Sequence, residues 1–444
     1  MASKPGHSSD PLLPPVVSDV RGLPPVEVAE NQRRRIELAM VAAVDRHGYA
    51  GTTLREVVAL AGVSKSTFYD HFESKQECFL ATFDEIVAAV AERVRVAYQA
   101  DGDFRQKLTA AVSCLMQIAV AEPQAAMLAA VESLSLGSVG IANRERSSEA
   151  FEPLIKESFD RSPSRKSVPT TMVRGIAAGT RGVIYRHVRE NRIDELPGTV
   201  DDLVDWALAY QARDSDIVRI AIRGAASSRG GGAPVDGTAG PDWREPPDSP
   251  RSRAELSQRE RITRAIAQLV VEKGYETLSI PSISAKAGTS NQTFYENFDN
   301  KRAAFLAAFD AIAEAALVSI RAAYEETGEG TKGVGAAIRT ALDHLAADEL
   351  LARLTFLELQ AAGAVALDRA DSVMDRLTGS LPVALGMESA RDGSEAVSRA
   401  IGSGCWSVVQ HQLIKGGADS LPQLAPDLAR MMLTPLSRPA ASTR

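Results

Sequence analysis

Two short segments carry closely spaced side chains that have short or planar hydrogen-bonding groups. The first, Lys65–His71, reads KSTFYDH, and the second, Asn291–Asn297, reads NQTFYEN. In both, hydroxyl, amide or amine groups surround a phenylalanine that we expect to be buried. Such side chains on one helix are what contact with base edges in the major groove of DNA requires. The sequence therefore predicts DNA-reading chemistry at two places in one chain.

The charge distribution agrees with local rather than general DNA binding. The 444 residues contain 50 Lys+Arg and 57 Asp+Glu, a formal net charge of −7, so the protein is not basic all over. Residues 33–76 and 259–302 each contain seven basic and five acidic side chains, a net charge of +2. The acidic excess lies outside the two segments that the chemistry singles out.

The two segments belong to a long internal repeat. Residues 33–86 align with residues 259–312 at a constant offset of 226 without a gap, and about 21 of the 54 positions are identical. The offset persists beyond this stretch and later slips slightly, so that His187 aligns with His411. A duplication of this length is a whole unit of roughly 180–190 residues rather than a motif.

The elements that must position the two segments are helices. In the first copy apolar residues recur every three or four positions until Gly48, which provides a left-handed stop. Thr53 then caps a second helix, and a tight turn at Gly62 leads to Ser64, the cap of a third helix. Ser74 caps a fourth. Two short helices joined by such a turn form a helix-turn-helix.

The rest of each copy is also helical in its pattern. No convincing alternating strand pattern is present, so the predicted fold class is all-α. In the first copy we expect helices near residues 104–121, 124–136, 148–160, 169–190 and 199–213, with corresponding segments in the second.

The sequence GYAGTTLREVVALAGVSKSTFYDHFESKQECFLATFDEI closely resembles the N-terminal DNA-binding domain of TetR/AcrR-type transcriptional regulators, and GYETLSIPSISAKAGTSNQTFYENFDNKRAAFLAAFDAI resembles it a second time. The resemblance covers about 50 residues per copy. Such regulators usually act as homodimers, with one helix-turn-helix per operator half-site. The resemblance implies an intramolecular pseudo-dimer: two helix-turn-helix domains, each followed by a helical effector-binding and dimerisation domain. The implied function is a ligand-responsive, DNA-binding transcriptional repressor.

The expected organisation follows from the repeat and the composition. Residues 1–30 and 224–257 are rich in proline, or in glycine, proline and serine, and bury little, so we expect a disordered extension and a flexible linker. The expected parts are 1–30 (extension), 31–84 (first head), 85–223 (first helical domain), 224–257 (linker), 258–310 (second head), 311–436 (second helical domain) and 437–444 (disordered tail).

The resemblance also implies which residues contact DNA. The N-cap residue of the second helix would contact a phosphate. The third helix would face bases or phosphates. Basic residues of the first and fourth helices would lie over the DNA backbone. The residues carried over by position are Arg33, Thr53, Lys65, Ser66, Thr67, Tyr69, His71 and Lys75 in the first head, and Arg259, Ser279, Asn291, Gln292, Thr293, Tyr295, Asn297 and Lys301 in the second.

The two reading helices are not identical. Lys65-Ser66 corresponds to Asn291-Gln292. Lysine favours the acceptors of guanine, whereas asparagine and glutamine pair with adenine in a bidentate way. We therefore expect an imperfect palindromic operator whose half-sites differ.

The helical domains are expected to pair with each other and to bind an effector. The small-residue-rich stretches 169–190 and 396–415 are the expected contact between the copies, and the apolar interior of each domain is the expected site of a small-molecule effector. Glu132 and Glu358, at matching positions, would be polar anchors for that ligand. Alternatively, these glutamates cap or pair structurally.

Other function classes have less support. Three cysteines lie far apart, and no HExxH, CxxC, GxSxG or phosphate-loop pattern is present, so we expect no enzyme activity, metal or cofactor. The absence of a signal sequence and of an apolar run of roughly 18 residues predicts a cytoplasmic protein without a membrane partner. We expect a monomeric pseudo-dimer, with further self-association open. The alternatives are a helical ligand-binding or adaptor protein that has lost DNA contact, and a regulator with one working head.

Overall fold

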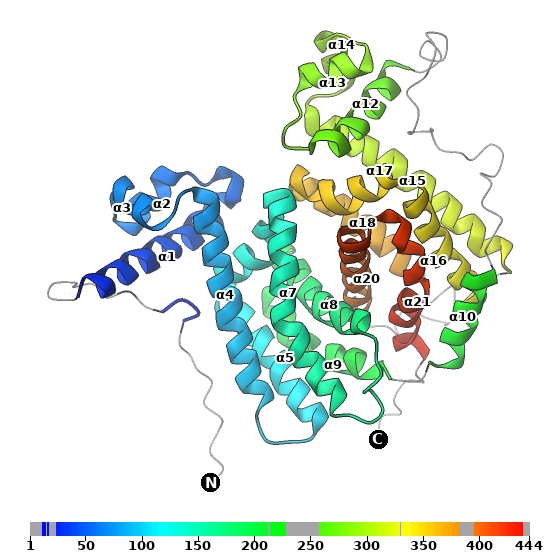
Figure 1. Cartoon of the computed structure of the whole chain (residues 1–444), viewed down its shortest axis with the longest axis horizontal. Coiled ribbons are helices and arrows are strands. Elements are labelled where there is room, and N and C mark those ends of the chain that lie inside the picture. Colours follow the sequence, from blue (N-terminus) through cyan, green and yellow to red (C-terminus); the bar gives the residue numbers. More distant parts are fainter. Residues whose placement is uncertain are drawn as a thin grey trace. The chain divides into compact units, whose positions relative to one another are not determined.

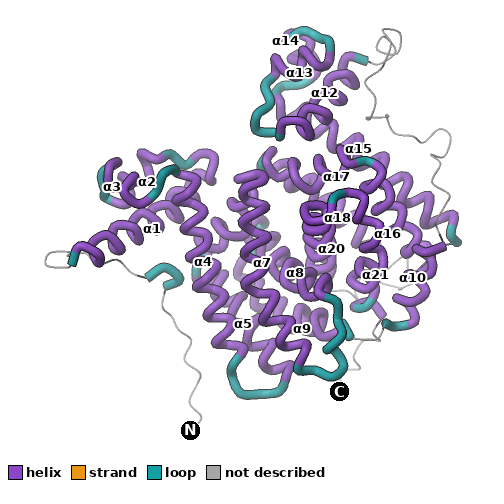
Figure 2. Tube along the Cα trace, in the orientation of Figure 1, coloured by secondary structure: helices purple, strands orange, loops and turns teal. Residues whose placement is uncertain are grey.

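The structure is entirely helical over the part of the chain that it describes. A computed structural model describes residues 11–14, 16, 24–211, 214–227, 257–328, 330–379, 381 and 395–437. Figure 2 shows helices and loops and no strand among these residues. The predicted all-α fold class is confirmed.

By its internal contacts the chain divides into two compact units, and the division does not follow the repeat boundary. The first unit comprises Met1–Ser133, Asn143–Leu154 and Val183–Val204. The second comprises Leu134–Ala142, Ile155–Gly182 and Asp205–Arg444. The second unit therefore contains the whole second repeat together with parts of the first.

The two repeats contain corresponding helices. The first runs through α1 (Pro25–Gly51), α2 (Leu54–Ala61), α3 (Lys65–His71), α4 (Lys75–Tyr98), α5 (Phe104–Ala121), α6 (Pro123–Ala126), η1 (Met127–Val131), η2 (Glu132–Leu136), α7 (Gly137–Asp160), α8 (Thr170–Arg189), η3 (Ile193–Thr199), α9 (Val200–Ala209) and α10 (Asp216–Ser227). The second runs through α12 (Gln258–Lys273), α13 (Ile280–Ala287), α14 (Asn291–Asn297), α15 (Lys301–Glu326), α16 (Gly330–Ala347), α17 (Glu349–Arg353), η4 (Leu354–Glu358), η5 (Leu359–Ala362), α18 (Ala364–Gly379), α20 (Glu395–Gly416), η7 (Ala418–Leu424), α21 (Ala425–Leu433) and η8 (Pro435–Ser437).

Each head is a small helical cluster at one end of a long helix. In the first unit α1, α2 and α3 gather at the start of α4, and in the second unit α12, α13 and α14 gather at the start of α15 (Figure 1). The first cluster buries one face of α1 around Met40 against Val57 of α2, Phe68 of α3 and Phe79 of α4, all with no exposed surface. The apolar face of α1 thus forms the surface against which the two short helices pack.

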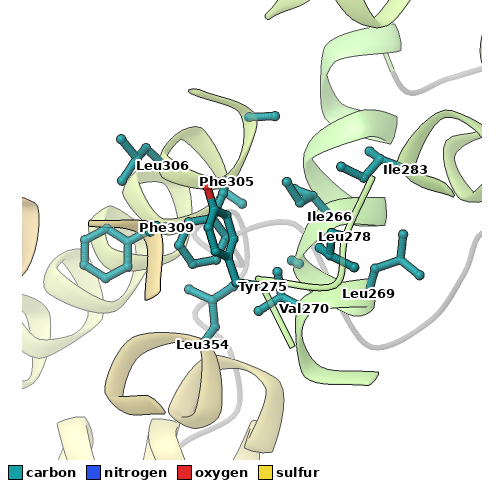
Figure 3. Close-up of a cluster of buried hydrophobic side chains, with 14 of the residues drawn as sticks. Ile266, Leu269, Val270, Tyr275, Leu278, Ile283, Phe305, Leu306, Phe309 and Leu354 are labelled. Carbon is teal, nitrogen blue, oxygen red and sulfur yellow. The ribbon is translucent and has the colours of Figure 1, made fainter. Parts of the chain in front are cut away.

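The second head has a core at the same positions, with isoleucine at 266 and 283 where the first head has methionine and valine. Ile266 and Val270 of α12 pack in one cluster with Ile283 of α13 and Phe305 of α15 (Figure 3). Leu354, from the helical domain, belongs to the same cluster. The head and its helical domain therefore share a continuous apolar core.

Helices from both repeats pack together inside the second unit. A Cβ atom on Gly179 of α8 would lie 2.5 Å from the carbonyl oxygen of Ala400 in α20 and would also meet the ring of Trp206. The Tyr210 hydroxyl donates a 2.9 Å hydrogen bond to the carbonyl oxygen of Met431 in α21. The contact at Gly179 joins the predicted stretches 169–190 and 396–415, and the backbones approach this closely because glycine has no side chain.

Helix α10 extends the first repeat into the expected linker. It ends at Ser227, so the helix includes the first residues of the segment 224–257 that composition marks as unstructured. A Cβ on Gly224 would lie 2.5 Å from the carbonyl oxygen of Lys332, and one on Gly335 of α16 would overlap the carbonyl oxygen of Ala221. The last helix of the first repeat is therefore packed, backbone against backbone, on the second. Residues 228–256 lie outside the described residues.

The N-terminal extension also differs from its expected disorder. Helix α1 begins at Pro25, inside the segment 1–30. Leu12 and Leu13 are only 6% and 5% exposed. The Leu12 amide donates to Oε1 of Glu122 at 3.3 Å, and the Arg93 guanidinium donates to the carbonyl oxygen of Pro11 at 2.8 Å. The segment 11–14 is thus fastened to α4 and to the end of α5.

We expect the double substitution Leu12→Ser and Leu13→Ser to lower the free energy of unfolding of the first unit by about 2 kcal/mol. Burial of a leucine stabilises by about 1.5–3 kcal/mol, and the ordering entropy of the segment offsets part of this gain. Urea denaturation of the full chain measures the change. Val16→Ser, at a position that is 39% exposed, is the matched control. Equal effects of the two changes would contradict a docked segment.

Two helical stretches are longer and more apolar than the sequence analysis expected. Pro123–Asp160 and Lys301–Glu326 each contain a window apolar enough to cross a membrane by length and composition alone, and 56% and 33% of these windows are buried. The expectation that no apolar run approaches this length was wrong. Phe305 and Phe309 of the second stretch belong to the core of the second head, so this part of the helix is occupied by packing.

Candidate nucleic-acid interface

The turn between the two short helices of each head depends on one glycine. Gly62 has φ 61° and ψ 37°, and Gly288 has φ 63° and ψ 40°, both in the left-handed region. Their amides cap the preceding helix by donating to the carbonyl oxygens of Ala59 and Ala285, at 3.2 Å in both heads. Because a side chain is strained in this conformation, glycine sets the angle between the two helices.

A serine then starts each third helix. The Ser64 hydroxyl accepts a hydrogen bond from the Thr67 amide, and Ser290 accepts one from Thr293, both at 3.0 Å. The same hydroxyls lie 2.9 and 3.0 Å from the hydroxyls of the two threonines. The hydroxyls of Thr67 and Thr293 are thereby oriented from within the helix.

The third helices are fixed by one buried ring each and leave several polar residues exposed. Phe68 and Phe294 have no exposed surface. Tyr69 and Tyr295, the next residues, are 50% and 59% exposed, and among the described residues they are two of the most exposed large hydrophobic side chains. Lys65 and Ser66 in α3, and Asn291 and Gln292 in α14, are also exposed, whereas Thr67 and Thr293 are half-buried. This is the arrangement that a groove-reading helix needs.

The outer faces differ in more than residue type. The Lys65 ammonium lies 5.7 Å from the centre of the Tyr69 ring. The Gln292 amide donates to Oε1 of Glu296 at 3.1 Å. In the second head, part of the hydrogen-bonding capacity of the reading helix is directed along its own axis.

The expected phosphate contacts of the second helices coincide with caps. The Thr53 hydroxyl accepts from the Glu56 amide at 3.2 Å, and the Ser279 hydroxyl accepts from the Ser282 amide at 3.4 Å. Both residues are exposed at a helix N-terminus, where backbone amides attract anions. Sequence reasoning left out Arg55, which is exposed beside Thr53. An arginine in the first turn, where the helix dipole disfavours a cation, was the signal for it.

Other expected contact residues are engaged inside the heads. Arg33 and Arg259 stack on the rings of Phe72 and Phe298, with 4.7 and 4.2 Å between the guanidinium carbon and the ring centre. Arg33 also pairs with Glu37 at 3.1 Å. These arginines hold the first helix against the end of the third, and DNA contact by them stays a prediction.

The two lysines at the start of the fourth helices are also engaged. Lys75 donates to the carbonyl oxygens of Tyr49 and Thr52, both at 2.9 Å. Lys301 donates to those of Tyr275 at 2.9 Å and Leu278 at 3.0 Å. Burial lowers the pKa of both lysines. The geometry favours a role in fixing the turn after the first helix, and phosphate contact by these lysines is untested.

His71 and Asn297 occupy the last position of the third helices. The ring of His71 lies 3.4 Å from the side-chain oxygen of Gln32, and burial followed by the charge of Arg33 lowers the pKa of His71. The Asn297 amide donates to the carbonyl oxygen of Thr293 at 2.8 Å. Both side chains are half-buried, and their place at the groove edge stays a prediction.

The two glutamates expected to anchor a ligand contact the heads, and ligand contact by them stays a prediction. Oε2 of Glu132 accepts a hydrogen bond from the Tyr49 amide at 2.8 Å, and Oε2 of Glu358 accepts one from the Tyr275 amide at 2.9 Å. This is the structural alternative, a cap, that the sequence left open.

Two buried thiols have strongly raised pKa values. Burial raises the pKa of Cys78 and of Cys405 to about 12, so neither thiol is a nucleophile at neutral pH. Among the described residues, no group of three or more His, Cys, Asp or Glu side chains is placed to hold a metal ion.

Comparison with known proteins finds the same family model at both heads. The family model described as "Bacterial regulatory proteins, tetR family" matches residues 41–82 and 262–308. The HTH-type transcriptional activator FasR of Mycolicibacterium smegmatis (strain ATCC 700084 / mc(2)155) is 42% identical over 82 residues, 18% of this chain and 37% of that protein. The match thus spans little more than a third of the relative's length.

Two solved structures are similar over a single repeat's length. The fatty acid degradation regulator FadR from Bacillus halodurans aligns with 18% identity and a TM-score of 0.38, over 40% of this chain and 94% of that one. A TetR-like transcriptional regulator from Rhodococcus sp. RHA1 aligns with 17% identity and a TM-score of 0.34, over 40% and 96%. These likenesses are too distant to support an argument. The family model matches both heads, where the helix-turn-helix geometry occurs twice, so the chain carries two helix-turn-helix domains of the tetR type in tandem.

Proposed function

We propose that the chain regulates transcription by binding one DNA duplex with both heads. The observation that carries this proposal is the duplicated reading helix. Each third helix is fixed to its head by a buried phenylalanine and exposes the first two polar residues of the helix and a tyrosine. In each head an exposed helix N-terminus and a tyrosine beside the reading residues provide further donors for phosphates.

The proposed operator is an imperfect palindrome. Because Lys65-Ser66 faces one half-site and Asn291-Gln292 the other, the half-sites differ in their preferred bases. Double-stranded DNA is the macromolecular partner, and the cytoplasm is the proposed location. The packing of α8 on α20 supports a monomeric pseudo-dimer in which the second head arrives with the first.

Repression relieved by a small-molecule effector is the proposed mode of regulation. An effector that binds one conformation of a helical domain better than another shifts the population of DNA-competent chains by its differential affinity. FasR is named an activator, and its aligned part is confined to 82 residues. Expression of a reporter gene placed behind the operator should rise when the gene for this protein is deleted. A fall in expression would show that the protein activates transcription.

Selection of bound fragments from random DNA tests the proposal. We expect two unlike half-sites about one helical turn apart, and an affinity that falls steeply with salt because counterions are released from phosphates. On dilution, binding should follow the concentration of single chains without a dimerisation step. Recovery of no enriched sequence would favour the alternative of a helical adaptor, and recovery of one half-site would leave one working head.

A further inference from the structure

The first helix of each head meets a sharp turn that is held from outside the head: α1 is kinked at Gly48, and α12 ends just before Gly274. Gly48 has φ 65° and Gly274 has φ 79°, so the chain turns sharply before Tyr49 and Tyr275. The amides of these tyrosines donate to Glu132 and Glu358, which follow them by 83 residues in both repeats. The same long-range hydrogen bond therefore occurs twice, once in each unit.

The other side of each tyrosine is held by the head itself. The carbonyl oxygens of Tyr49 and Tyr275 accept hydrogen bonds from Lys75 and Lys301, at 2.9 Å in both heads. The peptide groups on both sides of the tyrosine are thus fixed, one by the helical domain and one by the fourth helix. In the second head the Tyr275 ring packs in the core cluster that also includes Leu354 of η4 (Figure 3).

Each glutamate lies where the helix geometry changes. Glu132 follows the π-helical turn Met127–Val131 and opens a 3-10 turn. Glu358 ends the π-helical turn Leu354–Glu358, and a 3-10 turn follows it. Between residues 127 and 137 only Leu128, Glu132 and Gly137 match their counterparts at 354, 358 and 363. The two copies therefore form the same rare turn from largely different residues, and π-helical turns occur frequently at functional sites.

The two π-helical turns are held by different neighbours. In the first unit, Arg144 of α7 donates to the carbonyl oxygen of Ala130 at 3.1 Å. In the second unit, Gln410 of α20 donates to the carbonyl oxygen of Phe356 at 2.6 Å, and the Phe356 ring packs on Trp406 at 4.4 Å between centres. Ala130 and Phe356 are equivalent positions, two residues before the glutamate.

We propose that Glu132 and Glu358 are positioning residues that couple each reading head to its helical domain, with Arg144 setting the first π-helical turn and Gln410 the second. A π-helical turn holds one residue more than an α-helical turn. Its conversion to α-helix moves the following residue by one helical step, about 100° and 1.5 Å. That step withdraws the carboxylate from the tyrosine amide and releases the first helix of the head.

The coupling differs between the heads. The first head responds to α7, a helix of its own domain, whereas the second responds to α20, the helix against which α8 of the first repeat packs. A change in the packing between the repeats therefore reaches the second head directly. The link to DNA reading rests on the proposed function, but the coupling itself is testable without DNA.

Hydrogen exchange of single amides in the full chain tests the two hydrogen bonds from the tyrosine amides to Glu132 and Glu358. Glu132→Ala should speed exchange of the Tyr49 amide about 10- to 100-fold, the range expected for loss of a hydrogen bond to a charged acceptor, and leave Tyr275 unchanged. Glu358→Ala should do the reverse. Glu132→Gln and Glu358→Gln should restore most of the protection, since the amide oxygen still accepts. Unchanged exchange at the partner tyrosine, or equal changes at both tyrosines, would overturn the proposal.

The neighbours of the π-helical turns give the second arm. Gln410→Ala should speed exchange at Tyr275 and not at Tyr49, and Arg144→Ala should do the opposite, in each case by less than the glutamate variant. Glu149→Ala, at an exposed position of α7, is the control and should change neither amide. If Gln410→Ala left Tyr275 unaffected, the assigned route from α20 would be wrong.

The third arm measures DNA. On the selected operator, Glu132→Ala and Glu358→Ala should each weaken binding about tenfold, with recovery in the glutamine variants. If the wild-type chain bound no DNA, the proposed function would fail, and the exchange arms would still decide the coupling. Weaker binding that the glutamine variants did not rescue would count against positioning by these carboxylates.

Discussion

Replacing Gly179 by leucine should unfold the second unit at temperatures at which the wild-type protein is folded. The first side-chain atom would already lie 2.5 Å from the Ala400 carbonyl oxygen and against the Trp206 ring. The carbonyl belongs to the backbone of α20, so it cannot rotate away as a side-chain terminus would. Overpacking of an ordered core costs about 1–3 kcal/mol per substitution, and more where backbone must shift. Thermal unfolding followed by circular dichroism measures the loss.

The alanine substitution at the same position separates packing from helix propensity. Alanine is favoured over glycine inside a helix by about 1 kcal/mol, so propensity alone predicts a gain in stability. We expect Gly179→Ala to lower the melting temperature, because the contact with Ala400 outweighs that gain. Gly379→Ala, in α18 where a Cβ meets nothing within 4 Å, is the matched control and should leave stability unchanged or raise it. A stabilising Gly179→Ala would mean that the two helices are not packed through this glycine.

Exchanging the reading residues of one head for those of the other should make the operator symmetric. The double substitution Lys65→Asn and Ser66→Gln gives α3 the residues that α14 carries at Asn291 and Gln292. Selection from random DNA should then return the second half-site twice. Preference for the original first half-site should fall about 10- to 100-fold, since a bidentate base contact contributes about 1–3 kcal/mol of discrimination.

A control for this exchange lies just outside the reading helix. Glu73→Asp also replaces a residue of the first head by its counterpart, Asp299, and it changes an exposed position beyond the end of α3. It should leave both half-sites as in the wild type. An unchanged operator after the exchange at 65 and 66 would show that these positions do not read bases.

The heads could be predicted from the sequence because their structure is local. The glycine at 62, the serine at 64 and the apolar positions at 57 and 68 lie in one short stretch of the chain, and each has one dominant physical role. The observed bounds of α2, α3 and α4 follow from caps that are visible in the chain. Expected helices at 104–121 and 169–190 also agree closely with α5 and α8.

Features that depend on distant partners were not predictable in this way. The end of helix α10 was assigned to a linker because glycine in the sequence indicates flexibility. Only the fold shows that Gly224 packs against the backbone of Lys332. Leu12 and Leu13 lie between prolines and have no periodicity that would indicate burial. The expected helix 124–136 is instead a short helix, a π-helical turn and a 3-10 turn, because Glu132 reaches an amide 83 positions earlier.

Helix α10 also decides where the chain can be divided. A gene cut at the repeat boundary, after Ser227, would give a first product with a bare amphipathic helix and a second product whose α16 has lost the helix that covers it. A cut placed before Asp214, which pairs with Arg430 at 2.8 Å, keeps α10 with the second product. The two halves are therefore not equivalent subunits, because α10 of the first repeat packs on α16 of the second. With a cut before Asp214, two copies of the first half would each lack α10, and two copies of the second half would each carry it.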